Sequence, residues 1–221
     1  MQRAMVLDAQ GKELSPCSRD RAEGLIRSGK ATLVSEEPLV IRLTRSIDLP
    51  TPKSPAQKES LVGKRVLLHI CCAPCATYTV KRLRELGADV TGYWYNPNIH
   101  PYSEHELRRE TLGRYAKEIG LPVIWEPGYE MPEFLQRVVG HERFRERCLI
   151  CYRMRLERTA RVASERGIDL ITTTLLISPY QDQRAIHRIG QEVASAHGIA
   201  FYFQNFRQGF AEHYRLAKAY D

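Results

Sequence analysis

The sequence predicts an α/β protein in which helices cover both faces of a mostly parallel sheet, preceded by a small α+β module. Two observations lead to this prediction. From residue 65 onward, short apolar runs alternate with longer helical stretches, which is the pattern of parallel strands connected by helices. Before residue 46 the segments are shorter, and a stretch rich in proline, serine and lysine separates the two parts.

The first 45 residues form the predicted accessory module. Strands are expected at 5–7, 31–35 and 38–43, with a turn at 10–12. A helix is expected from Ser18, its N-cap, through Ile26, with Gly29 just past its end. Residues 46–63 contain Pro50, Pro52 and Pro55 and have the composition of a linker, which leaves 64–221 as the main domain.

Strands and helices alternate along the main domain. The predicted strands are 66–70, 89–95, 122–125, 169–174 and 200–203. The predicted helices are 77–86, 103–119, 131–139, 149–165 and 182–197. Because each helix connects two strands that run the same way, we expect a Rossmann-like sheet. Ligands bind such sheets at the carboxyl edge, where residues 71–75 and 172–180 would lie.

Charge and the lack of long apolar runs limit the class of protein. The formal net charge of the 221 residues is +7, which favours a polyanionic partner such as nucleic acid. Eight arginines lie between Arg143 and Arg166 against three glutamates. No apolar run approaches the roughly 20 residues that cross a membrane, and the start of the chain does not resemble a signal peptide. We therefore expect a cytoplasmic protein without membrane contact, whose thiols stay reduced.

Five of the six cysteines fall in two clusters. Cys71, Cys72 and Cys75 directly follow the first strand of the main domain, and Cys148 and Cys151 lie one helical turn apart. Two adjacent thiols and a distant Cys-x-x-Cys pair can supply four soft ligands to one metal centre, with a fifth left over. The sixth cysteine stands alone in the accessory module, where we expect an inert thiol.

The cluster spacing favours iron–sulfur chemistry over structural zinc. Structural zinc sites usually pair two Cys-x-x-Cys knuckles, whereas adjacent cysteines suit two corners of an iron–sulfur cluster. Cys72 and Cys75 also have the spacing of a thioredoxin-like motif before a helix. That interpretation would leave Cys71, Cys148 and Cys151 without a role.

Four motifs in order resemble a known family. They are His-Ile-Cys-Cys-Ala-Pro-Cys at 69–75, Tyr-Asn-Pro-Asn-Ile-His-Pro at 95–101, Arg-Cys-Leu-Ile-Cys-Tyr-Arg at 147–153 and Thr-Thr-Leu-Leu-Ile-Ser-Pro-Tyr-Gln at 173–181. Residues 64–219 resemble the QueH family of epoxyqueuosine reductases through these motifs. The resemblance implies reduction of the epoxide of epoxyqueuosine, at the wobble position of tRNA, by two electrons and two protons. Water is lost and queuosine is formed.

The resemblance also implies the cofactors and partners. Cys71, Cys72, Cys148 and Cys151 would hold a 4Fe–4S cluster, and Cys75 is the candidate ligand of a second metal ion, an iron, beside it. The partners would be the anticodon stem-loop of tRNA and an electron donor that the sequence does not identify. Members of the family commonly continue into a C-terminal segment with a Cys-x-Cys pair, which would begin where this sequence stops, so either the sequence is cut short or the pair is dispensable here.

The predicted reaction needs a group that protonates or binds the epoxide oxygen. The candidate catalytic residues are Cys75, Tyr180, Asp182 and His100. The last three have ordinary structural alternatives: packing for Tyr180, a helix N-cap for Asp182 and an unremarkable loop position for His100. Contacts to the anticodon loop are expected from the arginines around Cys148 and from Asn96, Asn98, Tyr102, Arg108 and Arg109.

The accessory module has a resemblance of its own. Residues 14–18, 22–31 and 38–43 are similar to the small N-terminal domain of IscB-like RNA-guided nucleases and some relatives of HNH nucleases. The nuclease residues themselves are absent from the sequence. This similarity implies contact with RNA, and the alternative is a cap that aids folding or oligomerisation.

Two other classes of function compete with the reductase. An ATP-dependent tRNA sulfur transferase would need a phosphate loop of the Ser-Gly-Gly-x-Asp-Ser type after the first strand, where this chain has Cys71–Cys75. A zinc-stabilised, non-catalytic RNA-binding protein would use the same thiols but would be colourless, because the d shell of zinc is full.

Overall fold

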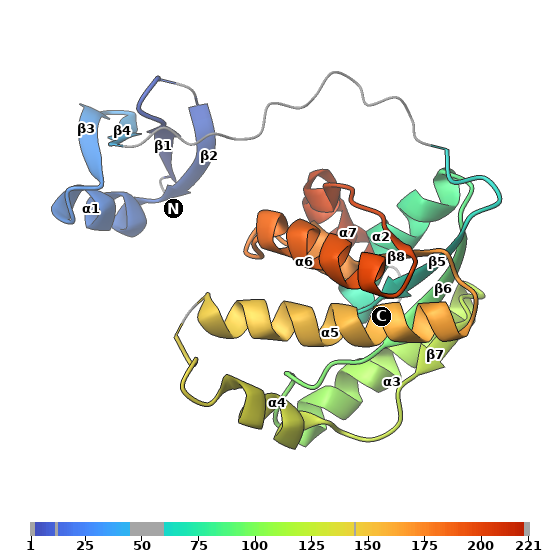
Figure 1. The fold of residues 1–221 in the computed structure, drawn as a ribbon. Coiled ribbons are helices and arrows are strands. Elements are labelled where there is room, and N and C mark those ends of the chain that lie inside the picture. Colours follow the sequence, from blue (N-terminus) through green and yellow to red (C-terminus); the bar gives the residue numbers. More distant parts are fainter. Residues whose placement is uncertain (1–2, 12, 45–59, 144, 219–221) are drawn as a thin grey trace. The chain divides into compact units, whose positions relative to one another are not determined.

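The computed structural model describes residues 3–11, 13–44, 60–143 and 145–218. These residues belong to two compact units, 1–57 and 58–221 (Figure 1). Most of the predicted linker at 46–63 lies outside the described residues. None of the described helices has both the length and the apolar character needed to cross a bilayer.

The first unit is a four-stranded sheet with one helix. Its elements are β1 (Arg3–Leu7), β2 (Glu13–Ser18), α1 (Arg19–Arg27), β3 (Ala31–Glu36) and β4 (Leu39–Leu43). The strand order is β2-β1-β4-β3, with β1 and β4 parallel and the two outer pairs antiparallel. The small core consists of Ala4, Val6, Ala22, Ala31 and Ile41.

The sequence did not predict strand β2, which contains Pro16. Proline cannot donate a hydrogen bond to a neighbouring strand and therefore argues against a central strand. Strand β2 lies at the edge of its sheet, where one side needs no donor. The position of the proline is consistent with the edge.

The second unit contains a five-stranded parallel sheet. Its strands are β5 (Arg65–His69), β6 (Asp89–Trp94), β7 (Val123–Trp125), β8 (Leu170–Thr173) and β9 (Ala200–Phe201). They are ordered β7-β6-β5-β8-β9, and every neighbouring pair is parallel. The predicted α/β fold with a mostly parallel sheet is therefore confirmed.

Helices flank this sheet on both faces. They are α2 (Ala73–Glu85), α3 (Tyr102–Glu118), α4 (Met131–Val138), α5 (Glu146–Glu165), α6 (Gln183–Ala196) and α7 (Phe210–Ala217), with short 3₁₀ turns η1 (Thr174–Ile177) and η2 (Phe206–Gly209). Helices α5 and α6 pack side by side, while α2 packs against α3 and α7 (Figure 1). Right-handed crossovers require these two groups to lie on opposite faces, because the chain moves outward through β6 and β7 and then returns to β8.

Two helices differ from the sequence prediction in ways that shape the site. Helix α2 begins at Ala73 rather than at residue 77, since Pro74 is well suited to the first turn of a helix. Helix α7 was not predicted, and it packs against α2. The backbone just before α7 lies close to α2, because a Cβ atom at Gly209 would lie 2.2 Å from the ring of Tyr78.

Candidate metal centre

The cysteine-rich segment after β5 and the threonine-rich segment after β8 meet at the point where the order of the strands in the sheet reverses. Strands β5 and β8 are neighbours, but the chain leaves β5 toward β6 and reaches β8 only after crossing back. Such a switch point is the usual ligand site of an open parallel sheet, because the loops that follow the two strands diverge there. The loop after β5 carries Cys71 and Cys72, and the loop after β8 begins with Thr174.

Three cysteine side chains converge at this switch point. The Sγ atoms of Cys71, Cys72 and Cys75 all lie within 4.8 Å of one another, and those of Cys71 and Cys72 are 3.8 Å apart. A tetrahedral ion with a metal–sulfur distance of about 2.3 Å places its ligand sulfurs about 3.8 Å apart. All six cysteines are free thiols. The three side chains can therefore serve as soft ligands of a metal.

Thr174 attaches Cys71 to the neighbouring strand. The Cys71 backbone N–H donates to Oγ1 of Thr174 at 3.0 Å, and the Thr174 hydroxyl lies 3.2 Å from the Cys71 Sγ and donates to it. Hydrogen bonds from Cys72 and Cys75, and then from Thr174, lower the pKa of Cys71 well below its usual range. The bond to Cys71 is also the largest influence that raises the pKa of Cys72, to about 12, and that of Cys75. The arrangement favours a thiolate at Cys71.

His69 lies directly beneath the cysteines and is fully buried. Its Nε2 is 3.1 Å from the carbonyl oxygen of Tyr95, which can only accept, so Nε2 carries the proton and Nδ1 accepts from the Thr173 hydroxyl at 2.9 Å. Burial, followed by the charge of Arg155, lowers the pKa of His69 to about 3. A neutral histidine thus connects the ends of β5, β6 and β8.

The second cysteine pair lies in the first two turns of α5. Cys148 and Cys151 are half-buried and pack against the main core. Within the described residues, their sulfurs lie outside the group formed by Cys71, Cys72 and Cys75. The structure thus places Cys75, rather than the α5 cysteines, in close contact with the adjacent pair.

Tyr152 connects the α5 cysteines to the loop after β8. Its hydroxyl donates to Oε1 of Gln181 at 2.7 Å and accepts the backbone N–H of Asp182 at 3.3 Å. Burial raises the pKa of Tyr152, and the nearby Cys148 and Cys151 also raise it. The start of α5 therefore lies at the same edge of the sheet as the loop that carries Thr174.

The three candidate acids occupy exposed positions. The side chain of Tyr180 is 82% exposed and meets the ring of Phe210 edge-on. Asp182 is the N-cap of α6, and its Oδ1 accepts the backbone N–H of Ala185 at 3.1 Å. His100 is exposed in the loop before α3. Arg207 fixes the loop around Tyr180 by donating to the carbonyl oxygens of Ser178 and Gln181.

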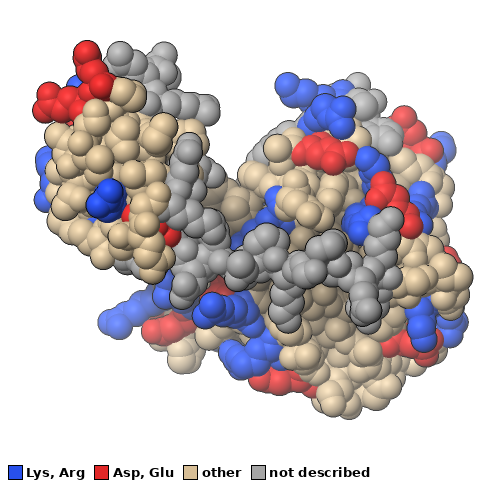
Figure 2. All heavy atoms as spheres, turned by 90° about the horizontal axis from the view of Figure 1, so that it is seen from above, with Lys and Arg blue, Asp and Glu red and all other residues tan. Residues whose placement is uncertain are grey.

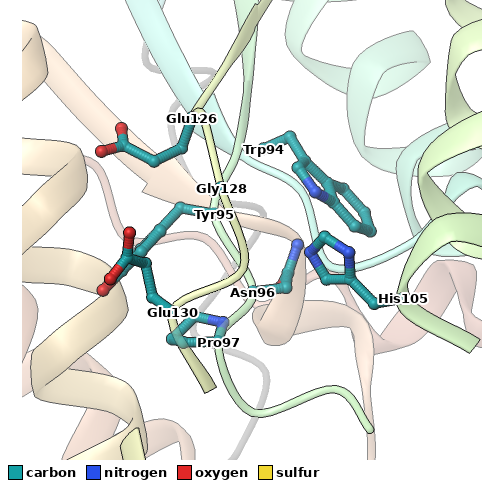
Figure 3. Close-up of a pocket in the computed structure, with 8 residues that line it drawn as sticks. All are labelled: Trp94, Tyr95, Asn96, Pro97, His105, Glu126, Gly128 and Glu130. Atoms are coloured by element: carbon teal, nitrogen blue, oxygen red, sulfur yellow. The ribbon is translucent and has the colours of Figure 1, made fainter. Parts of the chain in front are cut away.

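A small pocket lies beside the end of β6 (Figure 3). It is lined by Trp94, Tyr95, Asn96, Pro97, His105, Glu126, Gly128 and Glu130. Its free space, about 10 Å³, holds about one water molecule and is too small for a nucleobase. Trp94 Nε1 and Asn96 Oδ1 are buried here without a hydrogen-bond partner among the described residues, so a bound water would satisfy them.

The expected RNA contacts near this pocket need one correction. Asn96 is 2% exposed, and its Nδ2 donates to the carbonyl oxygen of Ile70 at 2.9 Å. The expectation that Asn96 contacts an RNA loop is therefore wrong, because this amide fixes the backbone just before the cysteines. Asn98 is half-buried, while Tyr102 is exposed.

Three arginines before the α5 cysteines are exposed. Arg143, Arg145 and Arg147 form no ion pair within the described part of the chain, whereas other exposed arginines of this unit, such as Arg137 and Arg188, pair with glutamates. On the face drawn in Figure 2, acidic and basic groups are interspersed. The unpaired arginines therefore supply a local positive charge beside Cys148.

Comparison with known proteins gives matches for both units. A family model described as epoxyqueuosine reductase QueH matches residues 66–221, and one described as RRXRR protein matches residues 4–64. The chain is 36% identical over 160 residues to epoxyqueuosine reductase QueH of Dehalococcoides mccartyi, covering 72% of this chain and 87% of that protein. It is 39% identical over 155 residues to the Helicobacter pylori protein of the same name, covering 68% of this chain but 41% of that longer protein.

The hydrogen bond from Thr174 makes a testable contribution to the thiolate. In the metal-free protein, Thr174→Val should raise the pKa of Cys71, because a hydrogen bond to the charged form favours that form. The pH dependence of Cys71 alkylation, followed by peptide mass spectrometry, should move to higher pH. Thr174→Ser keeps the hydroxyl and should behave like the wild type. An identical pH profile for the valine variant would rule out this role.

Proposed function

The chain belongs to the QueH family of epoxyqueuosine reductases, and we propose that it reduces the epoxide of epoxyqueuosine at the wobble position of tRNA. The reaction breaks both carbon–oxygen bonds of the epoxide, consumes two electrons and two protons, and releases the oxygen as water, leaving the double bond of queuosine. The observation that carries the proposal is the convergence of Cys71, Cys72 and Cys75 at the switch point of the sheet, within the residues that match the family.

The donor set fits the redox centre that this reaction requires. Soft thiolates select iron–sulfur clusters and soft ions over magnesium or calcium. We assign Cys71, Cys72, Cys148 and Cys151 as the ligands of a 4Fe–4S cluster and Cys75 as a ligand of a second metal ion, an iron. When bound, the cluster would supply electrons one at a time and the second ion would act as a Lewis acid.

The residues around the cysteines are proposed to fix the metal ligands in place and to donate a proton to the substrate. The hydrogen bonds between Thr174 and Cys71 fix one thiolate. Neutral His69 connects the ends of β5 and β8 through Thr173 without adding a charge. Tyr180 is our proposed proton donor to the departing oxygen, because its hydroxyl is exposed whereas the Asp182 carboxylate already caps α6. Asp182 and His100 remain the alternative acids.

Two surfaces are proposed to hold the tRNA. Arg143, Arg145 and Arg147 would bind phosphates of the anticodon stem-loop beside the cysteines, since exposed arginines without carboxylate partners are free to do so. The first unit, which resembles the N-terminal domain of IscB-like nucleases, would add contacts elsewhere on the RNA. A tRNA substrate and reduced thiols both suit the cytoplasm, and the electron donor would be another protein or small reductant of that compartment.

The competing functions fit less well. The position of a sulfur transferase phosphate loop is occupied by Cys71–Cys75, whose side chains converge on one another. A structural zinc site would explain three or four thiols but gives no role to the fifth or to an exposed tyrosine at the same edge of the sheet.

The cluster assignment predicts which cysteine is essential. After anaerobic reconstitution, the wild type should hold about four irons with sulfide and absorb visible light. Cys148→Ser should lose most of this iron and colour. Cys17→Ser, in the first unit, is the matched control and should keep both. One zinc without sulfide in the wild type would contradict the assignment.

The proton-donor assignment predicts different outcomes at neighbouring positions. Tyr180→Phe should lower kcat by about 10²- to 10⁴-fold, because it removes a positioned acid but keeps the ring. Asp182→Asn should have little effect, since asparagine caps a helix as well as aspartate. Single-turnover kinetics with epoxyqueuosine-tRNA measure both. Wild-type rates in Tyr180→Phe would exclude Tyr180 as the proton donor and leave Asp182 and His100 as the candidates.

One tRNA-binding assay tests both proposed surfaces. Neutralising Arg143, Arg145 and Arg147 together to glutamine should weaken binding and flatten its salt dependence, because fewer counterions are released. The control, Arg137→Gln, removes an arginine already paired with Glu133 and should change little. Removing residues 1–60 should also weaken binding. Unchanged affinity in either case would exclude that surface.

A further inference from the structure

Arg155 is an unusual buried charge. It lies on α5 with 5% of its surface exposed, and its Nε donates to the backbone carbonyl of Cys151 at 3.2 Å. In the part of the chain that the structure describes, it forms no ion pair with a carboxylate, although buried arginines are rarely left without an anion. A guanidinium cannot escape this cost by losing its proton.

Other arginines of α5 are placed differently. Arg153 pairs with Glu192 on the surface, and Arg158 pairs with Glu126 at 3.3 Å while lying over the ring of Tyr95. Arg161 reaches Glu165 along the helix. Each of these three cations has a carboxylate partner and water access. Among the described arginines of α5, Arg155 is the one that is buried without a carboxylate partner.

The position of Arg155 lies between the two cysteine segments. Helix α5 packs against β5, which leads into Cys71, and against β8, which leads into Thr174. Arg155 follows Cys148 by seven residues and Cys151 by four, so the three residues lie on one face of α5. Arg155 therefore shares the helix face that carries the second cysteine pair.

We propose that Arg155 is the internal counter-charge of the cysteine centre, where it offsets the negative charge of the thiolates and of the soft-metal centre that they hold. This inference rests on the proposed role of the cysteines as metal ligands. Four thiolates around a divalent ion or a cluster leave a net negative charge, and each added electron increases it. A fixed cation nearby favours both the assembly of the centre and its reduced form. Arg155 is therefore a positioning residue and does not touch the substrate.

The proposal is tested by removing the charge while keeping the shape. Arg155→Met is neutral, unbranched and suited to a buried site, and Arg155→Lys keeps the charge. Arg153→Gln is the matched control, because it removes an exposed cation two residues away on the same helix. Circular dichroism and thermal unfolding of the metal-free proteins establish that each variant folds. The metal-free methionine variant should be at least as stable as the wild type, since it no longer buries a charge.

The first readout is the midpoint potential of the reconstituted centre, followed by visible absorbance during anaerobic reduction. Arg155→Met should shift the midpoint to more negative values or retain less iron. Arg155→Lys should stay close to the wild type, and Arg153→Gln should match it. Equal potentials and equal iron content in folded wild type and Arg155→Met would overturn the proposal. Equal defects in the lysine and methionine variants would also overturn it, because shape rather than charge would then matter.

The second readout does not depend on the reductase assignment. Binding of Co²⁺ to the metal-free thiols, seen by its thiolate absorbance, should be about 10- to 100-fold weaker in Arg155→Met than in the wild type. Equal Co²⁺ affinity would overturn the role of Arg155. If the wild type binds Co²⁺ but never assembles a cluster, the proposed function fails, while the cobalt comparison still decides the counter-charge.

Discussion

The candidate site depends on one contact between distant segments, the pair of hydrogen bonds between Thr174 and Cys71. These residues are 103 positions apart in the chain, yet the parallel register of β5 and β8 ends both strands at the same level. The threonine hydroxyl accepts the Cys71 backbone N–H and donates to the Cys71 sulfur, so it fixes both the main chain and the charge of the first ligand. The cysteine loop, the buried histidine below it and the start of α5 are all arranged around this junction.

Much of the fold followed from patterns that are local in sequence. Strand β5 has an apolar centre at 66–68 and β8 begins with Leu170 and Ile171, because both faces of a parallel sheet are covered, and glycines mark the helix ends. Strand β2 escaped prediction because Pro16 is acceptable only at an edge, and edge position is a property of the whole sheet. Helix α7 also escaped, since its place is set by packing against α2 rather than by a strong signal of its own.

The sequence identified the cysteines of the candidate site but not the residues that support them. Soft side chains at metal-like spacing are visible in a sequence, and the structure brings three of the predicted five, Cys71, Cys72 and Cys75, together. The grouping of Cys75 with Cys71 and Cys72 depends on where α2 begins. The roles of His69, Thr174 and Arg155 depend on burial and on contacts across the sheet, which no local pattern reveals. The run of three threonines at 172–174 was the one visible signal, because it lies at the carboxyl edge of the sheet, where ligands bind.

The central claim is that this edge of the sheet removes one oxygen atom from a modified tRNA base. The most direct measurement incubates the reconstituted full chain with epoxyqueuosine-tRNA and a chemical reductant without oxygen, and then weighs the released nucleoside by mass spectrometry. We expect a product lighter than epoxyqueuosine by one oxygen atom, formed only with reductant. An unchanged nucleoside would contradict the account if the Dehalococcoides mccartyi relative converts the same tRNA and this chain carries its full complement of iron.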